Sequence, residues 1–306
     1  MIVDVHQHLW PEPLITALRT RSDPPRLRDW TLELAGEPDY RIDPHEHDVA
    51  RRVTESQDDG VGLALNSLSS PLGIETLAAP QALGLLEAYH DGSLALPRPY
   101  QAWAAACLTE IDPAAVEREL DRGFVGLQLP ATALLDEAGY DRVAPLLSTL
   151  QDAGRPLFIH PGPAAVPRSP GPGWWPAIVT YVQQMHAAWF AFRAFGRKRH
   201  ADLSVCFAML AGLGPLHGER FAARAGLRTV ADRGVFLEIS SYGTKAIDAT
   251  VRMLGIDGLV NGSDRPYAQP VSPELGDAAL HALRTANPLR LLNRTREVSD
   301  ELASAS

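Results

Sequence analysis

The sequence has few of the features expected of a secreted, membrane-spanning or redox-active protein. Its 306 residues include only two cysteines, Cys107 and Cys206, which lie far apart in apolar stretches, so we expect buried free thiols. No apolar run reaches the ~18 residues that a membrane-spanning helix needs. Asp4, His6 and His8 stand where a signal peptide would be apolar. These absences favour a cytoplasmic protein without a membrane partner.

The sequence also lacks a surplus of positive charge. Its 28 Lys and Arg residues are outnumbered by 37 Asp and Glu residues, which gives a net charge of -9. Nucleic-acid binding usually requires a clustered basic face, so we expect no nucleic-acid partner. Hydrophobic residues make up 45% of the chain, enough for a large core. The expected partner is therefore a small-molecule substrate.

Short apolar runs alternate with helical patterns along the chain. Eight runs are typical of parallel strands buried on both faces: 2–5, 61–66, 100–105, 125–129, 157–160, 203–208, 235–239 and 258–261. Helical patterns occupy 48–57, 80–90, 113–121, 141–153, 175–195, 216–225, 244–254, 273–286 and 288–292. This alternation predicts a (β/α)8 TIM barrel over residues 1–294, followed by a flexible tail, 295–306.

The alternative fold is a doubly wound open sheet. No Gly-x-Gly-x-x-Gly motif follows the first predicted strand, which disfavours a dinucleotide-binding version of that fold. Two segments, 11–44 and 161–176, are expected to be irregular. In a barrel both would lie on the C-terminal face, where active sites are built.

His6 and His8 form a pair at the end of the first predicted strand. Side chains on a strand alternate with period 2, so both imidazoles point the same way and form half of a metal site. The alternative is a pair of solvated loop histidines. His160 ends the fifth predicted strand and Asp264 follows the eighth. In a barrel these strand ends converge, and nitrogen and oxygen ligands suit one divalent ion, with Zn²⁺ favoured over Mn²⁺.

Four segments resemble a known family: Asp-Val-His-Gln-His at 4–8, Phe-Ile-His-Pro at 158–161, Gly-Ser-Asp-Arg-Pro-Tyr at 262–267 and Asn-Pro-Leu-Arg-Leu-Leu at 287–292. They are similar to the amidohydrolase-related proteins. Within that family they resemble the branch of metal-dependent aromatic-acid decarboxylases that includes aminocarboxymuconate semialdehyde decarboxylase. The resemblance implies that His6, His8, His160 and Asp264 bind one divalent metal, and that Asp264 contacts the metal-bound water. It also leaves a homodimer open.

One position departs from the family pattern. Met209 stands where the family has a histidine after the sixth strand, and a thioether can neither take nor give a proton. Ordinary core packing also explains a methionine. His217, at the start of the next predicted helix, and His186, within the preceding one, are possible replacements. Asp264 and His217 are therefore the predicted catalytic residues.

The missing histidine leaves three functional interpretations open. The first is a metal-dependent hydrolase acting on a small carboxylated or aromatic molecule, with Asp264 as the base for a metal-bound water. The runner-up is a non-oxidative decarboxylase of an aromatic or enol acid. The third is a catalytically silent ligand-binding relative.

Five further residues lie where they could contact a substrate. Arg41 and Arg265 could pair with a carboxylate, although surface salt bridges would also explain them. Gln128 could point into the barrel. Trp10 and Trp174 could wall the pocket, with packing as the alternative.

Overall fold

The computed structural model describes residues 1–166, 171–227 and 231–293. Its centre is built from parallel strands in two sheets, one of three strands in the order β1-β5-β6 and one of five in the order β11-β10-β9-β8-β7. These strands are β1 (Ile2–Gln7), β5 (Val61–Asn66), β6 (Tyr100–Ala102), β7 (Leu127–Pro130), β8 (Leu157–His160), β9 (Val205–Phe207), β10 (Val235–Glu238) and β11 (Leu259–Val260). All eight strands predicted from apolar runs are present.

The two sheets meet edge to edge along two seams. At one seam the Gln128 N–H donates to the Ala104 carbonyl at 2.8 Å, and at the other the Val5 N–H donates to the Asn261 carbonyl at 3.0 Å. Only isolated bridges join the sheets there, so the ladder is interrupted at both seams. The eight strands nevertheless surround one core. The fold is the predicted (β/α)8 barrel and not the open doubly wound sheet.

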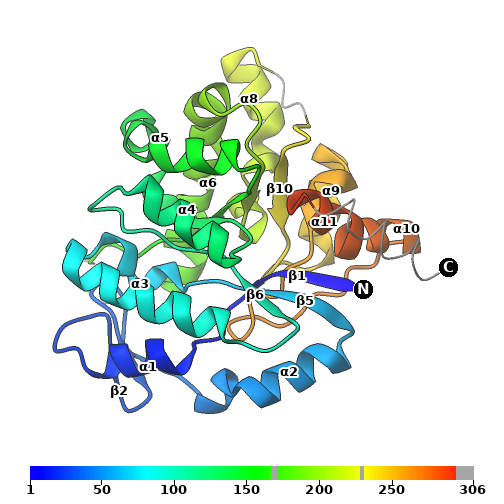
Figure 1. The fold of residues 1–306 in the computed structure, drawn as a ribbon. Helices are drawn as coiled ribbons and strands as arrows, with labels where there is room; N and C mark the ends of the chain where they lie inside the picture. Colours follow the sequence, from blue (N-terminus) through cyan, green and yellow to red (C-terminus); the bar gives the residue numbers. More distant parts are fainter. Residues whose placement is uncertain (167–170, 228–230, 294–306) are drawn as a thin grey trace.

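Helices surround the strands, because each parallel crossover returns along the outside of the sheet (Figure 1). They are α2 (Val49–Asp58), α3 (Ala79–Leu94), α4 (Pro113–Arg122), α5 (Glu137–Asp152), α6 (Tyr181–Ala191), α7 (Arg197–Arg199), α8 (Gly218–Ala225), α9 (Thr244–Leu254), α10 (Asp277–His281) and α11 (Asn287–Leu291). Two π-helical turns, Pro176–Thr180 and Phe192–Gly196, extend α6, and a third, Ala282–Ala286, joins α10 to α11. No helix in the described ranges is both long and apolar enough to cross a lipid bilayer.

Aspartate side chains cap the first turns of three outer helices, α2, α4 and α5. Asp112 accepts a hydrogen bond from the Ala115 N–H at the start of α4. Asp136 accepts one from the Gly139 N–H, so α5 begins at Glu137, four residues before the predicted start. The sequence pattern located these helices, but their first turns depend on capping hydrogen bonds.

The segment 11–44 is more ordered than predicted. It contains α1 (Glu12–Arg19) and a three-stranded antiparallel sheet of β2 (Arg26–Arg28), β3 (Thr31–Glu33) and β4 (Tyr40–Arg41). Leu27 and Leu32 are paired across β2 and β3, and both are buried. Strands of two or three residues are too short for period-2 alternation to be recognised, so the expectation of an irregular insertion was wrong.

The chain after β9 forms a left-handed turn. Met209, Leu210, Ala211 and Leu213 have φ between 47° and 59°, a region that costs a non-glycine residue ~1–2 kcal/mol. Burial of Leu210 and Ala211 offsets part of this cost. A Cβ at Gly212 would overlap the Val182 carbonyl, so α6 packs directly on this turn. The helix predicted at 216–225 begins at Gly218, as α8, after this turn.

The remaining short 3₁₀ turns lie between the barrel elements. They are Pro44–His47, Ser70–Leu72, Ile74–Thr76, Ala131–Ala133 and Ile256–Gly258. The boundary expected at residue 294 stays a prediction, because 294–306, which includes the expected tail, lies outside the described residues.

A polar cluster is buried between the segment after β5 and strand β7. The Ser70 hydroxyl donates to Glu75 and accepts from the Gln128 side-chain amide at 2.8 Å. Glu75 and Gln128 are fully buried, and one oxygen of each has no hydrogen-bond partner among the described residues. Burial raises the pKa of Glu75 to about 7, although the Ser70 hydrogen bond opposes the shift. A protonated Glu75 would supply the donor that this cluster lacks.

We therefore predict that Glu75→Gln makes the protein more stable at alkaline pH. The folded state retains a proton on Glu75 between pH ~4.5 and about 7, whereas the unfolded state releases it, so the free energy of unfolding decreases as the pH rises through this window. The full effect is about 3 kcal/mol. Urea denaturation at pH 5 and pH 8 measures it: the variant should gain on the wild type only at pH 8. The exposed Glu117→Gln is the control. An equal difference at both pH values would contradict the assignment.

Candidate metal centre

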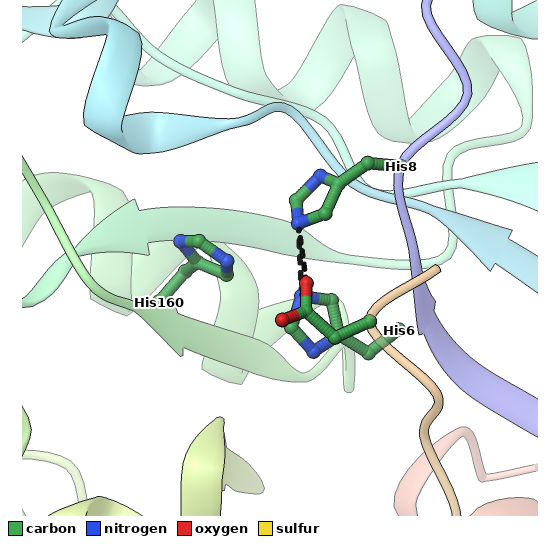
Figure 2. Close-up of side chains that lie close together, drawn as sticks. His6, His8 and His160 are labelled. Atoms are coloured by element: carbon green, nitrogen blue, oxygen red, sulfur yellow. Dashed lines mark hydrogen bonds and ion pairs between the residues drawn. The ribbon is translucent and has the colours of Figure 1, made fainter. Parts of the chain in front are cut away.

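Four side chains from three strand ends meet at the C-terminal end of the barrel. His6 belongs to β1 and His8 follows it, His160 ends β8, and Asp264 follows β11. One ligand atom from each lies within 4.8 Å of the others. Figure 2 shows the three labelled imidazoles turned toward one another. The structure thus brings together the four residues that the sequence predicts as metal ligands.

Hydrogen bonds to the three Nδ1 atoms orient the imidazoles. The Nδ1 atom of His6 lies 3.0 Å from a carboxylate oxygen of Glu238. The Nδ1 atoms of His8 and His160 lie 2.9 and 2.8 Å from backbone carbonyl oxygens. Carbonyl oxygens only accept, so each of these Nδ1 atoms carries the hydrogen, and the Nε2 lone pair faces the centre.

The group of facing atoms fits a cation. The Nε2 atoms of His6 and His8 are 3.1 Å apart, and Asp264 Oδ1 lies 3.4 and 3.2 Å from them. Burial lowers the pKa of His6 to about 4 and that of His160 well below its usual value, so both imidazoles are neutral near pH 7. Lone pairs and a carboxylate therefore converge without a proton to share, a donor set that suits Zn²⁺ or Mn²⁺.

Glu238 orients the His6 imidazole through the hydrogen bond to its Nδ1 atom. Besides His6, it accepts hydrogen bonds from the Ser240 backbone N–H, from the Ser240 hydroxyl at 2.8 Å and from the Met209 N–H at 3.2 Å. Burial raises the pKa of Glu238 to about 7, and these donors oppose the shift. Glu238 is the last residue of β10, and this position places its carboxyl group beside His6.

Asp4 ties the first strand to the segment that carries Asp264. Its buried carboxylate accepts from the His6 N–H at 3.1 Å and from the Ser263 N–H at 3.0 Å. Asp264 itself has φ 57°, and its N–H donates to the His6 carbonyl at 2.8 Å. The sequence alone does not reveal this role of Asp4, because an acid inside an apolar strand has no local pattern that identifies its partner.

Arg52 supports the same segment from α2. Its guanidinium is buried and donates to the His8 carbonyl at 3.0 Å and to the Gln7 side chain at 2.7 Å. Truncating it would leave the buried His8 carbonyl without this donor, and the Gln7 side-chain oxygen with the Tyr100 hydroxyl as its remaining donor. The backbone that presents His8 is therefore held from outside the barrel.

A cavity of about 620 Å³ opens above the four ligands. Aromatic side chains make up much of its wall: Trp10, Tyr40, Tyr181, Tyr242 and Tyr267. The remaining wall is largely apolar, with Glu37 as a further acidic group and Met209 beside the ligands. Such a concave, mostly apolar space with a few polar groups is typical of a small-molecule site.

Two of the predicted substrate residues are buried near the cavity. Trp10 lines it, donates to the Ser69 hydroxyl at 3.1 Å and stacks on His47 with ring centroids 4.9 Å apart. Gln128 is buried, and its side chain lies in the Ser70–Glu75 cluster. It is not among the described residues that line the cavity. Its amide nitrogen donates to the Leu68 carbonyl and to the Ser70 hydroxyl.

The other three lie away from the described cavity wall. Arg41 is exposed on the edge strand β4. Arg265 forms an ion pair with Asp59 at 2.7 Å. Trp174 is 57% exposed, and its neighbour Gly173 lines the cavity instead. Sequence position placed these residues at the rim, but side-chain direction depends on loop conformations that no periodicity encodes.

The catalytic histidine expected in place of Met209 is not at the cavity. His217 is exposed and packs edge-on against His186, with ring centroids 4.8 Å apart, and neither lines the cavity. Met209 does line it. Among the described residues, the only imidazoles at the cavity are therefore those of His6, His8 and His160.

Comparison with solved structures shows which proteins share this fold. IDCase from Metarhizium anisopliae superposes with a TM-score of 0.78 at 18% identity, covering 96% of this chain and 97% of that one. A 5-carboxyvanillate decarboxylase from Sphingomonas paucimobilis has a TM-score of 0.69 at 18% identity, covering 95% and 98%. The resemblance inferred from four sequence segments is thus confirmed at the level of the fold.

A third structure carries a metal. A 5-carboxyvanillate decarboxylase from Novosphingobium aromaticivorans, complexed with manganese and 4-hydroxy-3-methoxy-5-nitrobenzoic acid, has a TM-score of 0.69 at 16% identity, covering 96% of each chain. No protein-family model and no curated protein sequence matches the chain.

We predict that the protein binds one divalent ion per chain. After chelation, titration with Mn²⁺ or Zn²⁺ should raise the melting temperature, because the ion binds only the folded state. His160→Ala should weaken binding by about 100-fold or more, since it removes one of four ligands. Thermal unfolding measures the melting temperature, and isothermal titration calorimetry measures the affinity. The exposed His45→Ala is the control. Equal affinity in the wild type and His160→Ala would refute the site.

Proposed function

We propose that this protein is a metal-dependent decarboxylase of the amidohydrolase-related family that releases CO₂ from a small aromatic or enol acid. The observation that carries the proposal is the convergence of His6, His8, His160 and Asp264 at the base of an aromatic-walled cavity. Two of the solved structures with this fold are named as decarboxylases, and one of them holds manganese and a substituted benzoic acid. These likenesses support decarboxylation over hydrolysis.

The residues divide the chemistry between them. A divalent ion held by the four ligands would supply Lewis-acid stabilisation of the negative charge on the substrate carboxylate and its neighbouring oxygen. When the C–C bond breaks and CO₂ leaves, its electron pair stays on the substrate carbon, which must take a proton. The Asp264 side chain is 16% exposed and lines the cavity, so its carboxylate is placed to take up a proton from the substrate's own acidic group or from solvent and to pass it to that carbon.

The cavity wall orients the substrate and excludes water. Trp10 and Tyr267 flank the ligands, and flat rings stack favourably on such faces. Leu32, Leu34 and Leu72 add apolar surface. A largely apolar, aromatic pocket suits a planar acid, and its apolar wall strengthens the electrostatic interactions around the reacting carbon.

The first test is CO₂ release from hydroxybenzoate-type acids by the Mn²⁺- or Zn²⁺-loaded protein. Asp264→Asn should lower kcat by about 100-fold or more, because the amide cannot deliver the proton. Metal content, measured on the same samples, separates loss of the proton carrier from loss of the ion. Unchanged turnover in a metal-replete Asp264→Asn would overturn the role of Asp264.

Hydrolysis is the second candidate, and Met209 is the observation that favours it. With a thioether at the cavity wall, Asp264 remains the nearest available base, and an activated water needs no further proton carrier when a metal lowers its pKa. Lactones and amides screened beside the aromatic acids distinguish the two reactions. Metal-dependent ligand binding without turnover in either screen would favour the silent relative.

A further inference from the structure

A second polar group faces the cavity from segments that do not carry the metal ligands. Glu37 lies between β3 and β4, and Tyr181 is the first residue of α6. The Tyr181 hydroxyl donates a hydrogen bond to Glu37, and both side chains line the cavity. This pair is used by neither the ligand set nor the proton transfer proposed for Asp264.

The position of Glu37 is fixed by close packing of two loops. A Cβ at Gly36 would overlap the Ala164 carbonyl, so the segment before Glu37 lies directly against the chain that follows β8. The Tyr181 hydrogen bond and this close packing together hold Glu37 at the cavity wall.

Glu37 supplies a carboxyl group to its part of the cavity. Burial raises the pKa of Glu37, although the hydrogen bond from the Tyr181 hydroxyl opposes the shift. Burial, Glu37, Tyr267 and Asp264 together raise the pKa of Tyr181, so its hydroxyl keeps its proton. No Arg or Lys is present among the described residues that line the cavity. A second anion entering this region would meet a carboxylate with no cation opposite.

We propose that Glu37 and Tyr181 form a specificity subsite that accepts a hydrogen-bond donor, a hydroxyl or amino group, on the part of the substrate away from the metal and rejects a second carboxylate there. The proposal rests on the proposed function, which places one carboxylate of the substrate at the metal centre. A carboxylate facing Glu37 would suffer like-charge repulsion in a partly desolvated site, whereas a hydroxyl or amino group can donate to the Glu37 carboxylate. Glu37 thus determines which substituted aromatic acids fit.

The test compares ligand binding rather than turnover. Calorimetry on the Mn²⁺-loaded protein measures dissociation constants for 3- and 4-hydroxybenzoate, 3- and 4-aminobenzoate and the corresponding benzene dicarboxylates. We expect at least one hydroxybenzoate or aminobenzoate to bind about tenfold or more tightly than the matching dicarboxylate. Glu37→Gln should reduce that ratio to about threefold or less by tightening dicarboxylate binding. The exposed Glu117→Gln is the matched control and should leave the ratio unchanged.

A second variant tests the same subsite without removing its charge. Gly36→Ala should displace Glu37 from Tyr181 and also lower the ratio, with circular dichroism confirming the fold. Two results would overturn the subsite while leaving the proposed function intact. In one, the wild type binds the dicarboxylate as tightly as the matching hydroxybenzoate or aminobenzoate. In the other, Glu37→Gln leaves the ratio of their affinities unchanged. If none of the acids binds in a metal-dependent manner, the proposed function fails and the subsite fails with it.

Discussion

Three Nδ1 hydrogen bonds determine the chemistry of this molecule. Each of them places the proton of an imidazole on the side away from the centre, so that His6, His8 and His160 present lone pairs to one point. The barrel supplies the rest, because parallel strands bring β1, β8 and the end of β11 to the same face. Asp4, Arg52 and Glu238 then fix the backbone and side chains that carry the ligands. Without the hydrogen bonds to the Nδ1 atoms and to the surrounding backbone, the four side chains would still be close together, but their ligand atoms would not point to one centre.

The sequence predicted what depends on local periodicity. Continuous apolar runs identify all eight strands, and the His-x-His pair and the strand-end residues His160 and Asp264 follow from the barrel geometry. What it could not predict depends on contacts between distant segments. Gln128 and Arg265 lie near the ends of barrel strands, yet their side chains are bound by Ser70 and Asp59. Likewise, Glu37 and Tyr181 are 144 positions apart in the chain and meet only in the folded protein.

The walls of the cavity come from segments inserted between the repeating units of the barrel. The small sheet β2–β4 contributes Leu32 and Tyr40, and the turn leading into α6 contributes Pro176 and Ile178. The ligands instead lie at the ends of barrel strands or just after them. This arrangement separates a rigid base, which positions the reacting atoms, from loops that can vary in length and sequence to select the molecule that enters.

Position 209 combines two roles that are carried by different atoms. Its backbone N–H donates to Glu238 and so helps to orient His6, while its side chain lies at the cavity wall. Any residue that tolerates the left-handed backbone keeps the N–H, so the side chain can be exchanged without disturbing the metal ligands. An evolutionary change at this one site can therefore alter the proton chemistry of the pocket while the ligand set is inherited intact. A substitution at position 209 thus changes the wall of the pocket without changing the atoms that would hold the ion.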